Sequence, residues 1–325
     1  MDIFNPYHSE FERALKALSR GKSPHNLYDP MEYLIQMGGK RIRPFLTLLA
    51  AECFGETAKS AMQAALAVEV FHNFTLMHDD IMDRAFLRRG QVTVHKKWNT
   101  NTAILSGDAM LILAYRLLEV YDEPKFRQLT RLFSKTAIEV CEGQQYDMDF
   151  ETSKEVSEQD YLEMIRLKTA VLIGCALQMG AIVADASAAD QRLLYDFGIE
   201  LGLAFQLQDD FLDAFGDQEA FGKKIGGDIL ENKKTILYHL AKKGGTADQV
   251  RQMEALMGGD GDLSPQDKIA VVTALYESSG AKADTKKLVL HHSQFADLKL
   301  GQLSIDEDQK KPFRELKDWL MKRDH

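Results

Sequence analysis

The stretch ALAVEVFHNFTLMHDDIMD, residues 65–83, is an apolar helical pattern that ends in an acidic cluster, and LGLAFQLQDDFLD, residues 201–213, repeats that ending. Both stretches are apolar on most sides of a helix, which predicts helices in the centre of a bundle. In each cluster the first and last aspartates are four residues apart, so the two carboxylates lie one turn apart on one helix face. Like charges at this spacing destabilise an isolated helix, so we expect a partner that compensates them.

The rest of the chain also predicts helices. Its seven prolines lie near expected helix starts or in connectors, and none occurs between Pro124 and Pro265. Alternating β-branched runs are few, whereas helix-start patterns recur at Ser157-Glu-Gln-Asp160, Ser187-Ala-Ala-Asp190 and Ser264-Pro265. The expected fold is a single all-α domain over residues 1–325, built as one thick helical bundle. Helices are expected at residues 8–20, 28–37, 42–54, 58–81, 100–120, 124–149, 158–184, 188–215, 233–243, 246–257, 265–279, 282–300 and 306–323.

The composition argues against several kinds of partner. A formal net charge of −9 disfavours nucleic acid or an anionic membrane as the main partner. The longest apolar run, residues 171–184, is expected to be too short for a membrane span and to form a buried core helix. Cys53, Cys141 and Cys175 are far apart, which predicts buried thiols in a reducing cytoplasm rather than disulfides or a zinc site. No signal-peptide pattern is expected at the N-terminus.

The two acidic clusters suggest a metal. They offer oxygen ligands with no cysteine nearby, which suits a hard cation, and Mg²⁺ commonly shares its coordination shell with phosphates. Two such clusters facing each other would hold a diphosphate between metal ions. A single Asp-Asp-x-x-Asp is a weak signal that a solvated helix end explains, but two copies after buried helices are much less often accidental.

Basic residues near these clusters supply positive charge, which is the second feature that diphosphate binding requires. Lys40 and Arg43 stand three apart at an expected helix start, where backbone N–H groups also favour anions. Arg88-Arg89 follows the first cluster, and Lys168-Thr169 interrupts an apolar helix. Taken one at a time, these cations are most simply solvated surface residues, except that Lys168 stands at the entry to the apolar run 171–184. Lys223, Lys224, Lys233 and Lys234 follow the second cluster.

Together these elements resemble the trans-type prenyl diphosphate synthases of the polyprenyl synthetase family. The matching residues run in the family's order over about residues 38–235. They are Gly39-Lys40-x-x-Arg43-Pro44, His72, Asp79-Asp80-x-x-Asp83, Arg88-Arg89-Gly90, Gly107-Asp108, Gly143-Gln144-x-x-Asp147, Lys168-Thr169, Phe205-Gln206-x-x-Asp209-Asp210-x-x-Asp213, Gly222-Lys223 and Gly226-x-Asp228.

The resemblance implies a role for each matching position. Isopentenyl diphosphate would bind Lys40, Arg43, His72 and Arg89. The allylic diphosphate would bind Arg88, Lys168, Thr169, Gln206, Lys223 and Lys233, where the Gly-Lys order favours Lys223 over Lys224. Three Mg²⁺ ions per active site would be held mainly by Asp79, Asp83 and Asp209, with Asp80, Asp210 and Asp213 in support. The implied catalytic groups are Asp79, Asp83, Asp209 and Lys168, and the implied assembly is a homodimer.

The implied reaction joins the two substrates head to tail. The diphosphate leaves the allylic substrate, the isopentenyl double bond attacks the resulting carbocation, and the departing diphosphate takes up the proton. A class I terpene cyclase is an alternative, but it needs no second diphosphate site and normally lacks a second Asp-Asp-x-x-Asp. A non-catalytic partner subunit of the same fold is another, but such a subunit should have lost aspartates or cations, and all are present here.

The resemblance also predicts the product length. In the family, residues just before the first motif form the floor of the tunnel that takes the growing chain. Phe74 lies five residues before Asp79, about 7.5 Å along a helix, and Phe71 lies one turn further back; ordinary core packing is the alternative for both rings. Phe74 followed by Thr75 resembles geranylgeranyl synthases, so the twenty-carbon product is predicted, with farnesyl diphosphate or a longer product as alternatives.

Overall fold

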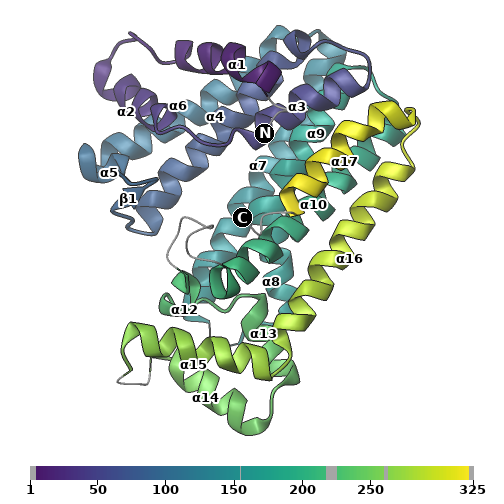
Figure 1. The fold of residues 1–325 in the computed structure, drawn as a ribbon. Coiled ribbons are helices and arrows are strands. Elements are labelled where there is room, and N and C mark those ends of the chain that lie inside the picture. Colours follow the sequence, from purple (N-terminus) through teal and green to yellow (C-terminus); the bar gives the residue numbers. More distant parts are fainter. Residues whose placement is uncertain (1–4, 154, 217–224, 260–262, 322–325) are drawn as a thin grey trace. The chain divides into compact units, whose positions relative to one another are not determined.

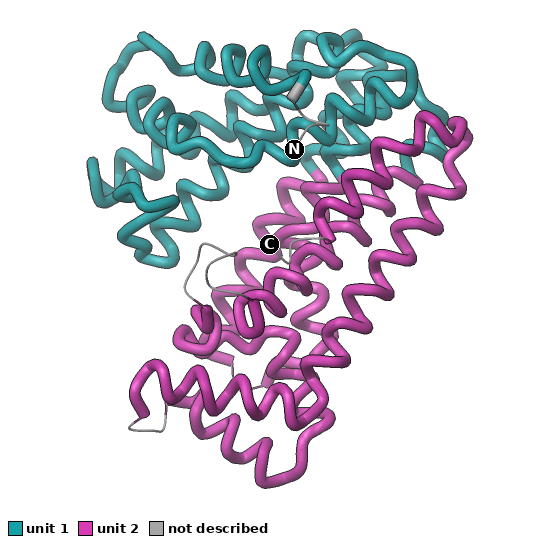
Figure 2. Tube along the Cα trace, viewed as in Figure 1, with its two compact units in different colours: residues 1–134, 175–192 teal, residues 135–174, 193–325 magenta. Residues whose placement is uncertain are grey.

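The computed structural model describes residues 5–153, 155–216, 225–259 and 263–321, and these residues are helical almost throughout (Figure 1). The predicted all-α class is confirmed. The chain forms two compact units (Figure 2): unit 1 comprises residues 1–134 and 175–192, and unit 2 comprises residues 135–174 and 193–325. Three helices contribute residues to both units, so the division does not fall at linkers; they are α7 (Glu123–Thr152), α9 (Val171–Val183) and α10 (Ala188–Phe215).

Unit 1 is built around α4 (Ala58–Met82), which packs against α3 (Ile42–Cys53) and α6 (Thr100–Leu117). The Thr57 side chain caps α4 by accepting a hydrogen bond from the Ser60 N–H, and the helix is buried on most sides, as its apolar pattern predicts. The other elements of unit 1 are α1 (Asn5–Ala17), α2 (His25–Gln36), β1 (Leu87–Arg88), β2 (Gln91–Val92), α5 (Val94–Lys97) and the 3₁₀ helix η2 (Leu118–Val120).

Unit 2 contains a second core, in which Tyr161, Leu207 and Tyr276 are buried together. Its helices begin at the predicted caps: Ser157 and Asp160 form a capping box, and Ser264 caps a helix with Pro265 in its first turn. Besides parts of α7, α9 and α10, unit 2 contains α8 (Glu158–Ile165), the π-helical segment η3 (Arg166–Ala170), α12 (Gly227–Leu230), α13 (Ile236–Gly244), α14 (Ala247–Met257), α15 (Pro265–Ser278), α16 (Ala281–Gly301) and α17 (Glu307–Met321).

Some details differ from the sequence-based expectations. The hairpin of β1 and β2 and the short helices α5 and α12 were not expected, because elements of two to four residues have no measurable periodicity. Pro30 and Pro312 lie inside α2 and α17 rather than at their starts. At a position this close to the start of a helix, a proline removes only one of the first backbone hydrogen bonds. Cys53 and Cys175 are buried as expected, but Cys141 is exposed on α7.

The apolar run after Lys168 belongs to the helical stretch Glu158–Val183, close to the helix expected over residues 158–184. The run 171–184 by itself was expected to be too short for a membrane span, but the whole stretch is long and apolar enough to cross a membrane. However, 78% of their most apolar window is buried within the protein, as in a core helix. At Gly180 an added Cβ would lie 2.2 Å from the Thr47 carbonyl oxygen, so α9 approaches α3 closely because this residue lacks a side chain.

Candidate active site

The first acidic motif ends α4 in unit 1, and its middle aspartate is held by the following hairpin. The Asp80 side chain is only 2% exposed. Arg88, on β1, donates from Nε to both Asp80 oxygens at 2.9 Å, and its Nη2 lies 2.8 Å from Oδ1. A guanidinium that contacts both oxygens of a carboxylate neutralises it and fixes its orientation. Asp80 is therefore fixed by the protein itself, between Asp79 and Asp83.

A group of basic side chains, including the partly buried Arg43 and His72, lies in the same unit. Arg43 Nη1 is 3.3 Å from His72 Nε2. Burial and the nearby guanidinium groups of Arg43, Arg89 and Arg88 hold the pKa of His72 well below its usual range, so the neutral imidazole accepts from Arg43 at Nε2. Burial also lowers the pKa of Arg43, an effect that the charge of Glu69 partly offsets. Several guanidinium groups around a neutral histidine form a site suited to an anion.

The glycine-rich segment before α3 brings Arg89 to this group. Gly39 has a φ of 146°, and a Cβ added there would lie 2.8 Å from Nη1 of Arg89. Only glycine therefore leaves room for the Arg89 guanidinium against the backbone beside Lys40. Of the residues predicted to bind isopentenyl diphosphate, the structure thus joins Arg43 to His72 and Arg89 to the segment that carries Lys40.

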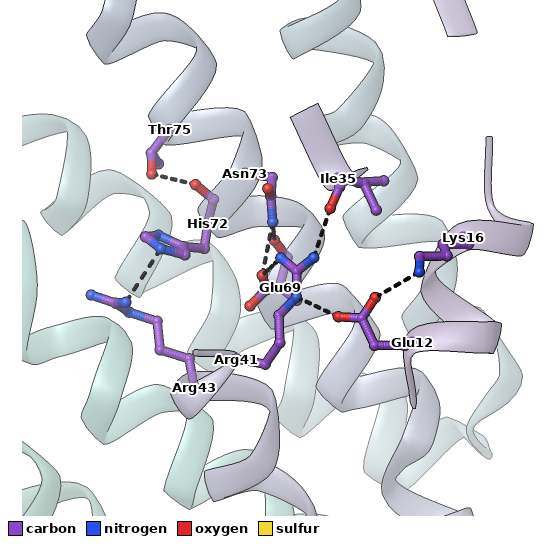
Figure 3. Close-up of polar contacts among 9 residues, drawn as sticks. All are labelled: Glu12, Lys16, Ile35, Arg41, Arg43, Glu69, His72, Asn73 and Thr75. Atoms are coloured by element: carbon purple, nitrogen blue, oxygen red, sulfur yellow. Dashed lines mark hydrogen bonds and ion pairs between the residues drawn. The ribbon is translucent and has the colours of Figure 1, made fainter. Parts of the chain in front are cut away.

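The sequence prediction missed Arg41, which lies between the two predicted ligands of that segment. Its guanidinium donates to Glu12 at 2.8 Å, to Glu69 at 2.6 Å and to the Ile35 carbonyl at 2.8 Å (Figure 3). The signal was present in the sequence: Glu69 is an acidic residue inside an apolar helical stretch, and a buried charge requires a partner.

The second acidic motif ends α10 in unit 2 and has different partners. Tyr161 donates to one oxygen of Asp210 at 2.5 Å, and the Gln206 amide donates to the other at 3.2 Å. Thr169 in turn donates to the Gln206 amide oxygen at 3.3 Å. Burial raises the pKa of Asp210 to about 7, although the bonds from Tyr161 and Gln206 oppose the rise. The prediction did not include Tyr161, which precedes Lys168 by two helical turns.

Lys168 lies in the π-helical segment η3 and forms an ion pair with Asp147 on α7. Gly143 makes this approach possible, because a Cβ there would lie 2.4 Å from the Lys168 backbone nitrogen. π-Helical turns often mark functional positions, because the inserted residue re-aims the side chains around it. Asp147 had no predicted role, and its partner is 21 residues away in the sequence.

The last aspartate of the second motif, Asp213, contacts a further acidic residue, Asp228. The Asp228 N–H donates to an Asp213 carboxylate oxygen at 3.0 Å. Burial and then the charge of Asp213 raise the pKa of Asp228 to about 6. The Lys233 ammonium lies 3.8 Å from Asp228 and 2.7 Å from Glu231. Lys223, predicted to bind the allylic diphosphate, lies outside the described residues.

The chemistry of these groups fits Mg²⁺. Among the residues that the structure describes, no three His, Cys, Asp or Glu side chains converge closely enough to form a metal cage of their own. Mg²⁺ is usually bound by one or two carboxylates together with waters and substrate phosphates, so it needs no such cage. Carboxylates at a helix end, with cations in the same unit, suit a metal that arrives with a diphosphate.

The rings predicted to form the tunnel floor stack along α4. The centroids of Phe71 and Phe74 are 5.5 Å apart, and Phe71 lies 5.2 Å from Phe133. Phe74 lies edge to face with His78 at 4.8 Å, and a Cβ at Gly107 would lie 2.2 Å from the His78 ring. Phe74 is therefore held between neighbouring rings in unit 1.

The sequence matches the polyprenyl synthetase family over residues 24–275. The chain belongs to this family. A geranylgeranyl diphosphate synthase from Methanosarcina mazei is 38% identical over 98% of this chain and 96% of its own. A geranylfarnesyl diphosphate synthase from Natronomonas pharaonis is 36% identical over 74% of each chain. A crystal structure of a geranylgeranyl pyrophosphate synthase is 52% identical and superimposes with a TM-score of 0.91 over 96% of each chain.

These similarities confirm the predicted family and the enzyme class, a trans-prenyltransferase. Within the described residues, the predicted ligands fall into two groups. Unit 1 carries Lys40, Arg43, His72, Arg88, Arg89 and the first acidic motif, and unit 2 carries Lys168, Thr169, Gln206, Lys233 and the second.

Proposed function

We propose that this enzyme condenses isopentenyl diphosphate with allylic diphosphates in a Mg²⁺-dependent reaction, and that its main product is geranylgeranyl diphosphate. One observation carries the proposal: each unit combines an Asp-Asp-x-x-Asp motif with buried or paired cations of its own. Two diphosphate substrates require two groups of cations, and the two acidic motifs together can hold the Mg²⁺ that acts on the leaving diphosphate. A terpene cyclase would need only one such group of cations.

In this proposal two groups of basic and polar residues bind different substrates. Lys40, Arg43, His72 and Arg89 hold isopentenyl diphosphate, while Lys168, Thr169, Gln206 and Lys233 hold the allylic diphosphate together with Arg88. Bound Mg²⁺, held by Asp79, Asp83 and Asp209, supplies positive charge that stabilises the leaving diphosphate. Lys168 and its neighbours add fixed positive charge at the same diphosphate. The protein provides no covalent nucleophile, and its contribution is positioning and charge stabilisation.

The proposed product length rests on Phe74 with Thr75 and on the names of two relatives that are called geranylgeranyl synthases. A longer product is the second candidate, because another relative is called a geranylfarnesyl synthase. Farnesyl diphosphate is the third. The decisive experiment is incubation of the purified protein alone with isopentenyl diphosphate, an allylic primer and Mg²⁺, followed by chromatography of the products. A twenty-carbon product supports the proposal, and failure to elongate any allylic primer would overturn it.

The tunnel floor can be tested in the same assay. Phe74→Ala removes a ring that is 8% exposed and is packed between Phe71 and His78. We expect longer products, because the growing chain can pass the position that the ring occupied. Thr75→Phe should shorten the product toward fifteen carbons. An active Phe74→Ala enzyme with an unchanged product distribution would show that Phe74 is not the floor.

We also propose that the enzyme is a cytoplasmic homodimer in which residues 1–325 form one functional domain. The three helices that contribute to both units support the single domain. Sedimentation equilibrium distinguishes a dimer from a monomer of 36.7 kDa.

A further inference from the structure

We propose that the buried network of Glu12, Arg41 and Glu69, here called the Arg41 network, is a positioning device that sets the affinity for isopentenyl diphosphate. Through this network the N-terminal helix α1 contributes to substrate binding without touching the substrate. The inference rests on the proposed function, in which Lys40, Arg43 and His72 bind that diphosphate.

The backbone around Arg41 follows a path that needs external support. Gly38, Gly39 and Arg41 have φ values of 77°, 146° and 49°, so three of four consecutive residues lie at positive φ. For an arginine this left-handed conformation is unfavourable, and it persists only where the surroundings hold it in place. Arg41 is also the N-cap residue of α3, so its backbone fixes where that helix begins.

The Arg41 network provides this support from three separate helices. Arg41 is 1% exposed and bonds to Glu12 on α1, to the Ile35 carbonyl on α2 and to Glu69 on α4. Glu69 is fixed in turn, because Asn73 donates to its carboxylate at 3.0 Å. These bonds therefore hold the segment that carries Lys40 and Arg43 in place at its midpoint.

The network also sets the charge around the proposed ligands. Glu69 precedes His72 by three residues on α4, and Arg41 precedes Arg43 by two. Figure 3 shows the two arginines side by side, one directed at Glu69 and the other at His72. The acidic partners of Arg41 offset one of the four guanidinium groups whose charges act on His72, which leaves Arg43 and Arg89 to attract the substrate. Loss of either acid would change both the position of the segment and this balance of charge.

Glu12→Gln tests the inference with little risk to folding, since Glu12 is 17% exposed and glutamine keeps its shape. We expect the KM for isopentenyl diphosphate to rise about fivefold or more, while the KM for the allylic substrate and kcat stay within about twofold. Glu69→Gln should raise the KM for isopentenyl diphosphate still more, again relative to the KM for the allylic substrate and kcat. Glu10→Gln is the matched control: it changes an exposed glutamate on the same helix and should leave all three constants unchanged.

The outcomes separate this inference from the proposed function. An unmodified enzyme that does not use isopentenyl diphosphate would overturn both. An active enzyme whose Glu12→Gln variant shows unchanged constants, or equal changes for both substrates, would overturn the inference alone. Thermal unfolding of each variant, measured beside the kinetics, identifies a general loss of structure, and a loss of structure would change both substrates' constants rather than one.

Discussion

The two acidic motifs have the same sequence pattern but different surroundings. In unit 1 the middle aspartate, Asp80, is bound by the charged guanidinium of Arg88. In unit 2 the equivalent Asp210 is bound by two neutral groups, the Tyr161 hydroxyl and the Gln206 amide. Asp80 is therefore held by a charged partner, and Asp210 by neutral ones.

This difference has a physical consequence for the acidic groups of unit 2. Burial and neighbouring carboxylates raise the pKa of Asp210 to about 7 and that of Asp228 to about 6. A raised pKa means that the ionised form is unfavourable in its surroundings. Bound cations would reverse this by favouring ionised carboxylates, so we expect metal binding to stabilise unit 2 more than unit 1.

The largest expected effect comes from removing the outer aspartate of either motif. Asp79→Ala and Asp209→Ala should each lower turnover by at least about a hundredfold, which is typical for the loss of one charge-stabilising group. Without metal the stability of both variants should be unchanged or higher, because repulsion between carboxylates is relieved. Steady-state kinetics with Mg²⁺ and thermal unfolding in a chelator measure the two quantities. Near-normal turnover in either variant would remove that motif from the mechanism.

A second prediction concerns the free energy of unfolding. Replacing the middle aspartate by asparagine should lower it in the first motif and raise it in the second. Asp80→Asn leaves Arg88 without its carboxylate and should lower the free energy of unfolding by about 2 kcal/mol. Asp210→Asn should instead stabilise the metal-free protein at pH 8. Folded Asp210 gives up its proton near pH 7, whereas an ordinary aspartate does so near 3.8, so its ionisation costs stability as the pH rises between these values.

Urea unfolding of the metal-free proteins at pH 5 and pH 8 measures both changes. The gain from Asp210→Asn should be larger at pH 8, because the folded carboxyl is still mostly protonated at pH 5. The loss of stability from Asp80→Asn should vary little between the two pH values. If both variants lose the same free energy of unfolding at both pH values, the two motifs have equivalent surroundings, and the proposed difference between them is wrong.

The long helices could be predicted from the sequence because their signals are local. Residues 188–215 were expected to form one helix, and α10 has those bounds, since Ser187 and Asp190 form the cap that the sequence suggests. The hairpin that carries Arg88 was missed because its strands have two residues each. Its position is set by tertiary contacts rather than by periodicity.

The site was predicted only in part, because only some of its residues carry a signal that is local in the sequence. The acidic motifs and their basic neighbours are contiguous in sequence, so they could be found there. Arg41 and Tyr161 were missed, because their roles depend on partners that are 29 and 49 residues away; for Arg41 the sequence showed only that Glu69 needs a partner, not which residue supplies it. Arg41 in particular looks like Lys40 and Arg43 until the structure shows that it is buried against two acids.

The smallest expected effect tests whether Arg43 and Lys168 bind different substrates. Arg43→Ala should raise the KM for isopentenyl diphosphate about tenfold more than that for the allylic substrate, because a buried guanidinium beside His72 is lost in unit 1. Lys168→Ala should show the reverse bias, because the lost ammonium is the partner of Asp147 in unit 2. Lys59→Ala, at an exposed position of α4, is the control and should change neither constant. Initial rates with one substrate varied and the other saturating give both constants. Equal effects of Arg43→Ala and Lys168→Ala on the two substrates would mean that both units contact the same diphosphate.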